Sequence, residues 1–313
     1  MNGKNILLTG AAGFMGSNLF KRLLLENNTG TVVLLTHHQD VSEETKIKNV
    51  IKVKCDLSDY AGLCNIISKY DINVIYHLAS NSIVRKCAND PLNAYLTNVM
   101  GTVNLLEAVR NVGMNTVKKI IISTSDKVYG HAPSPYTEDT KFEPRYTYEA
   151  TKSCQDIVAQ NYFHNYGLPI NIIRCSNVYG LHDPNTSRLI PNTIKSINNN
   201  KNPIVHSGVA DFVREFVFVD DVIDAIFLIE NKAQNGEAFC VGGTDKIKIL
   251  DLVKKISEAM GYSGGVDVIE KPANFQEIRE QYIDSSKLKS LGWDPKYNLD
   301  KGIDLCIKSE SYK

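Results

Sequence analysis

The chain has 313 residues, of which 43% are hydrophobic and 22% charged, and its 35 basic side chains balance its 35 acidic ones. A neutral chain of this length has ample core for one large or two modest domains. It lacks the net positive charge whose electrostatic field draws proteins to nucleic acid or anionic membranes. No apolar run reaches the ~20 residues of a membrane-spanning helix, and the N-terminus has no signal-peptide hydrophobic region. We therefore expect no nucleic-acid and no membrane partner.

The cysteines and histidines argue against two further classes of protein. Seven cysteines occur, an odd number, and no two of them lie within three residues of each other. This usage indicates reduced thiols and a cytoplasmic location rather than a disulfide framework. The seven histidines show neither the HExxH spacing nor pairing with cysteines, so we expect no metal site.

Up to residue 175, short apolar runs alternate with longer amphipathic segments. Strands are expected at residues 5–9, 31–36, 50–54, 74–77, 119–123 and 170–175, and helices at 15–26, 59–69, 91–111 and 148–166. Such alternation predicts an α/β fold with a doubly wound parallel sheet. In these sheets, ligands bind at the carboxyl ends of the strands.

After residue 176 the alternation weakens, which indicates a second, smaller domain. A strand and a helix are expected over 214–230, where the chain rejoins the first domain, and another helix over 249–260. We expect one domain to contain residues 1–176 and about 213–237. Residues 177–212 and 238–313 then form a smaller C-terminal α/β lobe.

A glycine turn, Gly10-Ala-Ala-Gly13-Phe14-Met15-Gly16, joins the first expected strand to the first expected helix. Gly10 permits the tight turn, Gly13 lets the backbone approach a pyrophosphate, and Gly16 lets the helix pack closely. The helix N-terminus then offers free N–H groups to the anion. Ordinary turns also need glycine, but this position between a strand and a helix favours a dinucleotide site.

The second strand ends in Thr36, His37 and His38, where NAD-binding chains carry an acid for the adenosine ribose. Without a carboxylate there is no repulsion against a 2′-phosphate, which favours NADP slightly. However, no arginine is present at this strand end, and histidine is a weak phosphate ligand near neutral pH. Exposed loop residues are the alternative interpretation of these histidines.

Asp56 and Leu57 follow the third expected strand. A side chain there could accept hydrogen bonds from the adenine amino group. The alternative is a structural role, because Asp56 or Ser58 would cap the next helix well. Both roles are compatible.

Tyr148 and Lys152 are four residues apart on an expected helix and therefore share one face. A nearby ammonium and a positively charged nicotinamide would lower the pKa of a tyrosine toward the range of a general base. The YxxxK spacing alone is uninformative. Together with the glycine turn and with Ser125 ahead of it, the spacing strongly indicates a catalytic pair.

The set of motifs resembles the extended short-chain dehydrogenase/reductase family, the NAD-dependent epimerases and dehydratases. The motifs are GAAGFMG (10–16), HLAS (77–80), NVMGTVNLLEA (98–108), STSDKVYG (123–130), YEATK (148–152), RCSNVYG (174–180), RLIP (188–191), VREFVFVDDV (213–222) and LGWDP (291–295). The resemblance implies a Rossmann domain that holds a nicotinamide cofactor, NAD(P), tightly, and a C-terminal domain for a nucleotide-diphosphate sugar. It also implies a homodimer through helices near 92–111 and 148–166. Residues 148–180 are similar to the CDP-glucose 4,6-dehydratase-like branch.

The resemblance also implies roles for individual residues. Ser125 aligns with the catalytic serine or threonine, Tyr148 with the base and Lys152 with its partner, while Asn98 matches an asparagine that orders the relay near Lys152. The implied cofactor contacts are Gly10, Gly13, Phe14, Met15, Gly16, Thr36, His37, Asp56, Leu57, Leu78, Ala79, Ser80, Asn98, Ser123, Tyr148, Lys152 and Cys175. The implied substrate contacts are Ser82, Asn177, Arg188, Leu189, Arg214 and Arg279. A guanidinium suits a diphosphate, and an ordinary surface charge is the alternative for each arginine.

Enzymes of this family can begin in the same way: Tyr148 removes the C4 hydroxyl proton while hydride leaves C4 for the nicotinamide. A 4-epimerase then only returns hydride to the other face. A 4,6-dehydratase also needs a base for the C5 proton and an acid for the departing C6 hydroxyl.

Asp126 and Lys127 lie where epimerases of the family carry small neutral residues and dehydratases carry Asp-Glu or Asp-Lys. We infer that Asp126 is the C6 acid and Lys127 the base or relay at C5. Both roles require shifted pKa values, Asp raised and Lys lowered, which an apolar site could supply and a mutual salt bridge would oppose. A solvated turn with two unlike charges is the alternative.

Three other functions stay open beside 4,6-dehydration. They are 4-epimerisation, 5,6-dehydration with hydride return to C4, and a non-catalytic cofactor sensor. The intact Ser125, Tyr148 and Lys152 argue against the sensor, because a sensor does not need them.

Overall fold

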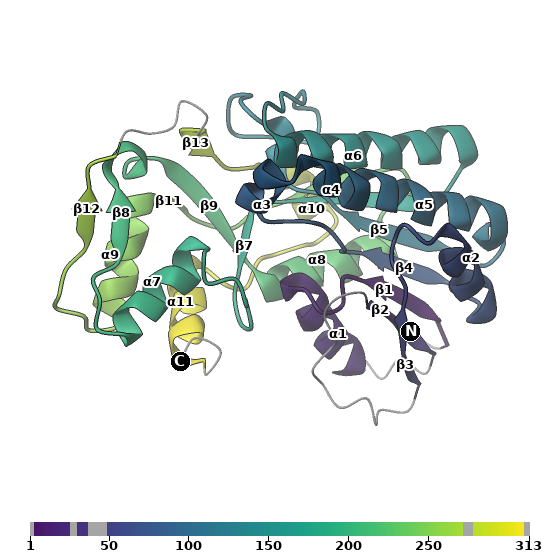
Figure 1. Cartoon of the computed structure of the whole chain (residues 1–313), viewed down its shortest axis with the longest axis horizontal. Coiled ribbons are helices and arrows are strands. Elements are labelled where there is room, and N and C mark those ends of the chain that lie inside the picture. Colours follow the sequence, from purple (N-terminus) through teal and green to yellow (C-terminus); the bar gives the residue numbers. More distant parts are fainter. Residues whose placement is uncertain (1–2, 26–29, 37–48, 272–277, 310–313) are drawn as a thin grey trace. The chain divides into compact units, whose positions relative to one another are not determined.

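The computed structural model describes residues 3–25, 30–36, 49–271 and 278–309. The chain forms two compact units (Figure 1). The first consists of Met1–Gly130, Lys141–Arg174 and Ile226–Phe239, and the second of His131–Thr140, Cys175–Ala225 and Cys240–Lys313.

The first unit is built on a seven-stranded sheet with the strand order β10-β6-β5-β4-β1-β2-β3. The strands are β1 (Ile6–Thr9), β2 (Val32–Thr36), β3 (Val50–Lys54), β4 (Val74–His77), β5 (Lys119–Ser123), β6 (Ile170–Cys175) and β10 (Ala238–Val241). From β3 to β6 all neighbouring pairs run parallel. The order is that of a Rossmann sheet, so the predicted fold class is confirmed.

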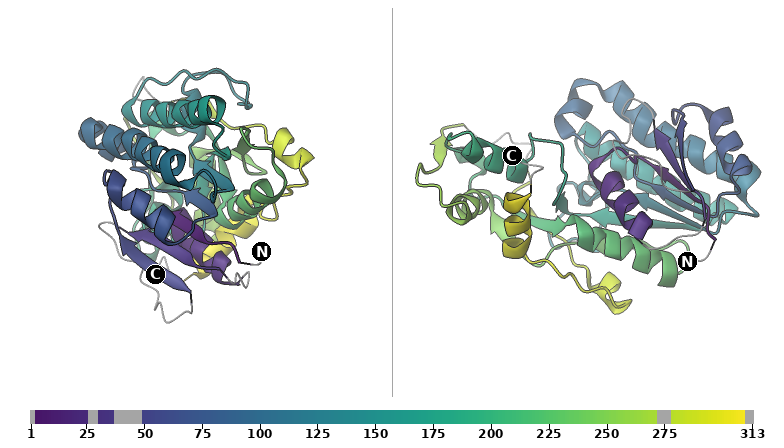
Figure 2. Two further views of the ribbon diagram at one scale, coloured as in Figure 1. Left: turned by 90° about the vertical axis from the view of Figure 1, so that its right-hand side faces the viewer. Right: turned by 90° about the horizontal axis from the view of Figure 1, so that it is seen from below.

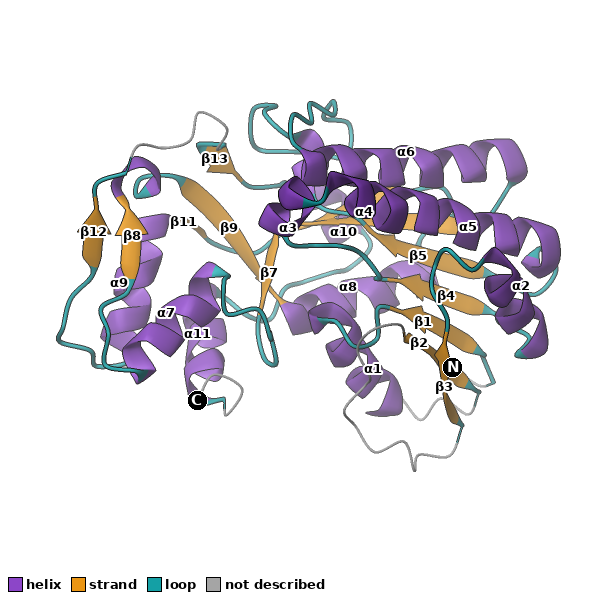
Figure 3. Ribbon diagram, viewed as in Figure 1, coloured by secondary structure: helices purple, strands orange, loops and turns teal. Residues whose placement is uncertain are grey.

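Helices cover both faces of this sheet (Figures 2 and 3). One face carries α2 (Tyr60–Lys69), α5 (Gly101–Ala108) and α6 (Thr147–Tyr166), and the other α1 (Phe14–Leu25) and the second half of α8 (Val219–Lys232). Because the strands are buried on both sides, they are nearly continuous apolar runs. The core under α2, α5 and α6 includes Leu7, Ile75, Leu106, Ile120 and Ala159.

One long helical run extends from Pro91 to Gly113 and lies against α6 (Figure 1). It consists of α4 (Pro91–Tyr95), the π-helical turn η1 (Leu96–Met100), α5 and a second π-helical turn, η2 (Val109–Gly113). The run begins with Pro91 in its first turn, and the carboxylate of Asp90 caps it by accepting the Asn93 N–H at 3.1 Å. The short helix α3 (Val84–Asn89) precedes it.

The second unit is centred on β9 (Val213–Phe218), which pairs with β7 (Asn177–Tyr179), β11 (Lys246–Lys248) and β13 (Glu280–Gln281). A separate pair joins β8 (Ile204–His206) to β12 (Asp267–Ile269). The helices are α7 (Leu189–Asn198), α9 (Ile249–Ala259), α10 (Ser286–Ser290), α11 (Leu299–Lys308) and the first half of α8. Phe218 stacks on Tyr297 at a centroid distance of 4.4 Å within their shared core.

The division between the units differs from the expected one chiefly over residues 131–140 and 213–225. Residues 213–225 belong to the second unit, because β9 pairs with strands that are not part of the Rossmann sheet. Residues 131–140 belong there too, since Tyr136 bridges to Ile283, a residue of the second unit. Within the described ranges, no helix combines the length and apolar character required to cross a bilayer.

Candidate active site

The glycine turn between β1 and α1 has the shape of a cradle for a ligand. Gly10 has a φ of +73°, and a Cβ on it would lie 2.6 Å from the Ala79 nitrogen. A Cβ on Gly16 would lie 2.0 Å from the Gly10 oxygen. At Gly13 a Cβ would meet only that same oxygen, at 3.2 Å, so the space beside the Gly13 backbone is open. The turn therefore fits the close approach of a pyrophosphate to the backbone, the contact expected of Gly13.

The ends of β2 and β3 define the ribose and adenine side of the predicted cofactor site. Thr36 ends β2 and is buried, whereas His37 and His38 lie outside the described residues. Asp56 Oδ1 accepts the Ser58 N–H at 2.6 Å, and α2 is capped by Asp59, whose Oδ1 accepts the Gly62 N–H at 2.9 Å. The alternative that Asp56 or Ser58 caps this helix is therefore wrong.

The end of β4 supplies the next predicted contacts, Leu78, Ala79 and Ser80. The Ser80 hydroxyl is buried and has no hydrogen-bond partner among the residues that the structure describes. An unsatisfied buried hydroxyl is uncommon and calls for an explanation. A bound cofactor at the carboxyl edge of the sheet would satisfy it.

Asn98, in η1, is fully buried and orders the elements around the site. Its side-chain oxygen accepts the Asn81 N–H at 2.7 Å, and its Nδ2 donates to the Asn81 oxygen at 3.1 Å and to Thr151 Oγ1 at 3.0 Å. Both amide hydrogens are used by the protein. Asn98 thus joins the segment after β4 to α6, which agrees with the ordering role implied for it.

The segment after β5 forms the 3₁₀ turn η3 (Asp126–Tyr129), with Ser125 as its N-cap. Ser125 Oγ accepts the Lys127 N–H at 3.2 Å and donates to Asp126 Oδ1 at 3.1 Å. Asp126 is only 2% exposed, whereas Lys127 is half-buried. The alternative of a solvated turn with two unlike charges therefore does not describe Asp126.

Tyr148 and Lys152 lie one turn apart on α6, as the spacing predicts. Tyr148 is buried against Cys87 and Ala94. Lys152 is 3% exposed, and its Nζ donates to the Ser123 oxygen at 3.0 Å and to Gln155 Oε1 at 2.9 Å. The structure thus connects Lys152 to the end of β5. Sequence reasoning missed Gln155, although its place one turn after Lys152 on the same face of α6 was a usable signal.

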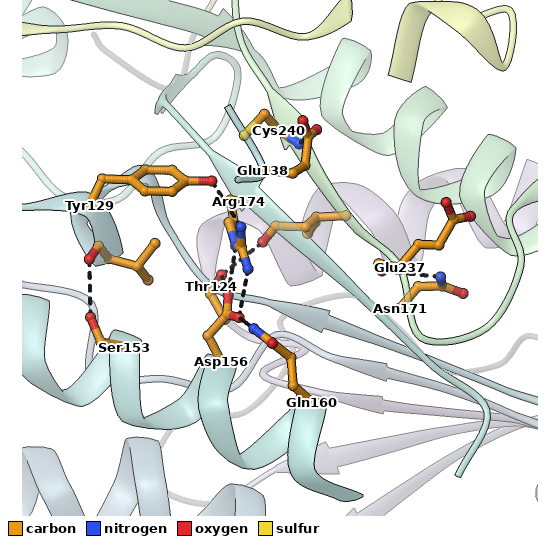
Figure 4. A network of polar contacts seen from close by, with 12 residues as sticks. Thr124, Tyr129, Glu138, Ser153, Asp156, Gln160, Asn171, Arg174, Glu237 and Cys240 are labelled. Carbon is orange, nitrogen blue, oxygen red and sulfur yellow. Dashed lines mark hydrogen bonds and ion pairs between the residues drawn. The ribbon is translucent and has the colours of Figure 1, made fainter. Parts of the chain in front are cut away.

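A buried ion pair supports the turn η3 (Figure 4). Arg174 donates to both carboxylate oxygens of Asp156, each at 2.9 Å, and to the Tyr129 hydroxyl at 3.0 Å. Thr124 Oγ1 also donates to Asp156, at 3.0 Å, and Ser153 Oγ donates to the Val128 oxygen at 3.2 Å. The segment 124–129 is therefore fastened to β6 and α6.

The predicted substrate contacts fall in both units. Ser82 is exposed in the first unit. In the second unit, β9 connects Asn177, Arg214 and Arg279. Asn177 Nδ2 donates to the backbone oxygen of Glu215 in β9 at 2.9 Å, and Arg214 Nη1, also from β9, donates to the backbone oxygen of Arg279 at 3.3 Å. Arg188 and Leu189 lie at the start of α7, where Arg188 pairs with the buried Asp183 at 3.0 Å. Cys175 is buried at the end of β6.

Comparison with known proteins identifies the family. The family model described as GDP-mannose 4,6 dehydratase matches residues 7–306. The chain belongs to this family. It is therefore a member of the extended short-chain dehydrogenase/reductases that act as nucleotide-sugar dehydratases and epimerases, as the motifs predicted.

Individual members of the family that resemble the chain over nearly its whole length include both kinds of enzyme. A dTDP-glucose 4,6-dehydratase of Escherichia coli is 30% identical over 96% of this chain and 92% of its own. The Haloferax volcanii protein named low-salt glycan biosynthesis protein Agl12 is 30% identical over 97% of each chain. Among solved structures, the NAD complex of Bacillus anthracis dTDP-glucose 4,6-dehydratase has a TM-score of 0.87 at 27% identity and covers 98% of this chain and 96% of its own. The Thermotoga maritima UDP-glucose 4-epimerase with UDP-glucose has a TM-score of 0.88 at 27% identity, with 97% of each chain covered.

Proposed function

We propose that the protein is a nucleotide-sugar 4,6-dehydratase with a tightly bound nicotinamide cofactor. The observation that carries the proposal is the burial of Asp126 beside Ser125, because a carboxyl group here has a use in removing the C6 hydroxyl and none in 4-epimerisation. The relatives named as dTDP-glucose 4,6-dehydratases agree with this choice.

The residues that would hold the cofactor are the turn Gly10–Gly16, Ser80, Tyr148 and Lys152. When bound, the nicotinamide accepts hydride from C4 of the sugar and later returns it at C6. We propose NAD before NADP, because solved structures of two related dTDP-glucose 4,6-dehydratases contain NAD. The lean toward NADP drawn from Thr36 and His37 finds no support in them.

The side chains of the first unit would move the protons. Tyr148 takes the C4 hydroxyl proton, and the Lys152 ammonium stabilises the resulting phenolate. The hydroxyl of Ser125 donates a hydrogen bond to the C4 oxygen. Once C4 is a ketone, Lys127 removes the C5 proton directly or through a relay, and Asp126 protonates the C6 hydroxyl, which departs as water. The return of hydride at C6 and of a proton at C5 completes the 4-keto-6-deoxy sugar.

The substrate would be a nucleotide-diphosphate sugar, with dTDP-glucose as the first candidate because the dehydratases among the relatives are named for it. Arg214 and Arg279 would compensate the diphosphate charge, and Arg188 is a third proposed contact. Asn177, Leu189 and Ser82 are the remaining proposed contacts.

A homodimer is the proposed assembly, and exposed apolar side chains support it. Leu92, Leu96 and Met100 recur every four residues on the run from Pro91 to Gly113 and are 69%, 52% and 46% exposed, and Ile157 on α6 is 56% exposed. An exposed apolar row on one helix, with an exposed apolar side chain on another, is typical of an interface between copies. Sedimentation of the Leu96→Lys variant tests the dimer, with Leu25→Lys on α1 as the control.

A panel of nucleotide sugars with detection of product mass tests the proposed reaction. A product lighter than its substrate by one water supports dehydration, and the position of the new methyl or alkene group separates 4,6- from 5,6-dehydration. An isomer of unchanged mass would establish the second candidate, a 4-epimerase, which the likeness to the Thermotoga maritima enzyme keeps in view. Cofactor binding without any change of a sugar would indicate a sensor.

A further inference from the structure

A buried chain of hydrogen bonds extends from Lys152 to the strand that enters the glycine turn. Lys152 Nζ donates to Gln155 Oε1 at 2.9 Å, and Gln155 Nε2 donates to Thr102 Oγ1 at 3.0 Å. Thr102 Oγ1 lies 2.9 Å from His77 Nε2, and His77 Nδ1 lies 2.8 Å from Thr9 Oγ1. Gln155, Thr102, His77 and Thr9 are all fully buried.

The chemistry of the partners fixes the direction of each bond. An ammonium can only donate, so the Gln155 oxygen faces Lys152 and its nitrogen faces Thr102. The Thr102 hydroxyl gives its one hydrogen to the Asn98 backbone oxygen at 2.8 Å and therefore accepts from both Gln155 and His77. Its donor and both its acceptor positions are then used.

This assignment also sets the tautomer of His77. Burial, the larger cause, and the nearby charge of Lys152 lower the pKa of His77 to about 3, so the ring is neutral near pH 7. Because Nε2 carries the hydrogen, Nδ1 accepts from the Thr9 hydroxyl, which in turn accepts the Ala79 N–H at 3.2 Å. Thr9 is followed by Gly10, so the chain of bonds links α6 to the predicted cofactor turn through uncharged groups.

We propose that Gln155 is a positioning residue that holds the Lys152 ammonium without compensating its charge. Only an amide at this position accepts from Lys152 and donates to Thr102 at once. A carboxylate would reach the ammonium but would neutralise it. An apolar side chain would remove one bond from the buried Lys152 ammonium and one from the buried Thr102 hydroxyl. The proposal rests on the proposed function, in which the charge of Lys152 stabilises the Tyr148 phenolate.

The other titratable groups around Lys152 come from separate elements. His77 of β4 is neutral, and burial raises the pKa of the Cys87 thiol of α3 against the opposing influence of Lys152. Asp126 and Lys127 belong to η3, which packs on α6. A charge introduced at position 155 would act on Lys152 from within hydrogen-bond distance, because Gln155 Oε1 lies 2.9 Å from its Nζ.

The test is a pH titration of the Tyr148 ring in protein labelled with ¹³C at the tyrosine hydroxyl carbon, with the resonance assigned through Tyr148→Phe. In Gln155→Glu we expect the titration midpoint to lie about 1 pH unit higher than in the wild type, because the added carboxylate offsets the ammonium. In Gln155→Leu, which nearly keeps the side-chain volume, we expect a loss of at least about tenfold in kcat, with KM for the sugar nearly unchanged. Gln160→Leu is the matched control, because Gln160 lies on the same helix but binds Asp156 instead, at 2.6 Å.

The titration does not depend on turnover, so it tests the role of Gln155 separately from the proposed function. If the wild type changes no sugar, the proposed function fails, and the Tyr148 midpoints still decide the role of Gln155. Equal midpoints in the wild type and Gln155→Glu would overturn that role. So would a Gln155→Leu variant of folded protein whose kcat matches that of Gln160→Leu.

Discussion

The Lys152 ammonium donates a hydrogen bond to the backbone oxygen of Ser123, across 3.0 Å. This bond fastens the helix that carries Tyr148 to the end of the strand from which Ser125, Asp126 and Lys127 continue. The groups proposed for oxidation at C4 and those proposed for elimination at C5 and C6 therefore share one anchor. A displacement of α6 would disturb both sets of groups together.

Substitutions at two positions of the glycine turn should separate an effect on folding stability from an effect on cofactor binding. A Cβ at Gly16 would lie 2.0 Å from the Gly10 oxygen, whereas a Cβ at Gly13 would lie 3.2 Å from the same atom and meet nothing else within 4 Å. We expect Gly16→Ala to lower the free energy of unfolding clearly. Gly13→Ala should cost less than about 1 kcal/mol, in the range of minor substitutions, yet weaken cofactor binding at least tenfold.

Chemical denaturation and cofactor titration of both variants provide the measurement. Gly167→Ala is a useful control, because its φ of +70° strains any added side chain while no atom lies within 4 Å of the new Cβ. Normal cofactor affinity in folded Gly13→Ala would contradict the assignment of this turn to the pyrophosphate.

The Arg174–Asp156 ion pair should be essential for stability because both partners are buried, at 3% and 0% side-chain exposure. Removing one partner leaves an uncompensated buried charge, which costs about 3–5 kcal/mol. We expect Arg174→Met to lose stability in this range by urea denaturation, and the double variant Arg174→Met/Asp156→Leu to recover part of the loss.

Lys248→Met is the matched control for this experiment, since Lys248 forms an exposed pair with Asp211 at 3.0 Å. Exposed pairs contribute little, so its unfolding curve should nearly overlay that of the wild type. Equal losses in Arg174→Met and Lys248→Met would show that the buried network does not hold η3 in place.

His77 gives the fold a defined sensitivity to acid. Its pKa is about 3 in the folded chain and about 6.5 when unfolded, so between these values the unfolded state binds one more proton. Stability from this group is therefore fully present above about pH 6.5 and declines as the pH falls toward 3. Between pH 7 and pH 5 it should decline by about 2 kcal/mol.

A comparison with His77→Asn isolates this contribution. The variant will be less stable at pH 7, because asparagine cannot reproduce the bonds to Thr9 and Thr102. Its free energy of unfolding should nevertheless change less between pH 7 and pH 5 than that of the wild type. An identical pH dependence in the two proteins would mean that His77 is not the buried neutral group described here.

Much of the Rossmann sheet was predictable, because its strands are buried on both faces and their apolar runs end at turns. The six expected strands are present, and four of them have the predicted ends, namely Val50–Lys54, Val74–His77, Lys119–Ser123 and Ile170–Cys175. The glycine turn and the pair Tyr148 and Lys152 were predictable for a similar reason, since their roles depend on spacing within one element.

What escaped prediction depends on pairing between distant segments. Residues 213–225 form an ordinary strand and the start of a helix, and only the partners of β9 reveal their unit. The bond of Gln155 to Thr102 joins α6 to α5, a relation that no local pattern in the chain expresses. The expected caps of α2, Asp56 and Ser58, lie three residues and one residue before the observed cap Asp59, because all three are good capping residues.

The most direct test of 4,6-dehydration measures product mass and cofactor reduction together for dTDP-glucose with the wild type, Asp126→Asn, Lys127→Ala and Tyr148→Phe. The wild type should release a product lighter by one water. Asp126→Asn and Lys127→Ala should still reduce the cofactor but lose water at least about 100-fold more slowly, the usual cost of removing an acid or base. Tyr148→Phe should do neither. Unchanged loss of water in the double variant Asp126→Asn/Lys127→Ala would contradict the account, and so would a wild type that yields only an isomer of every sugar supplied.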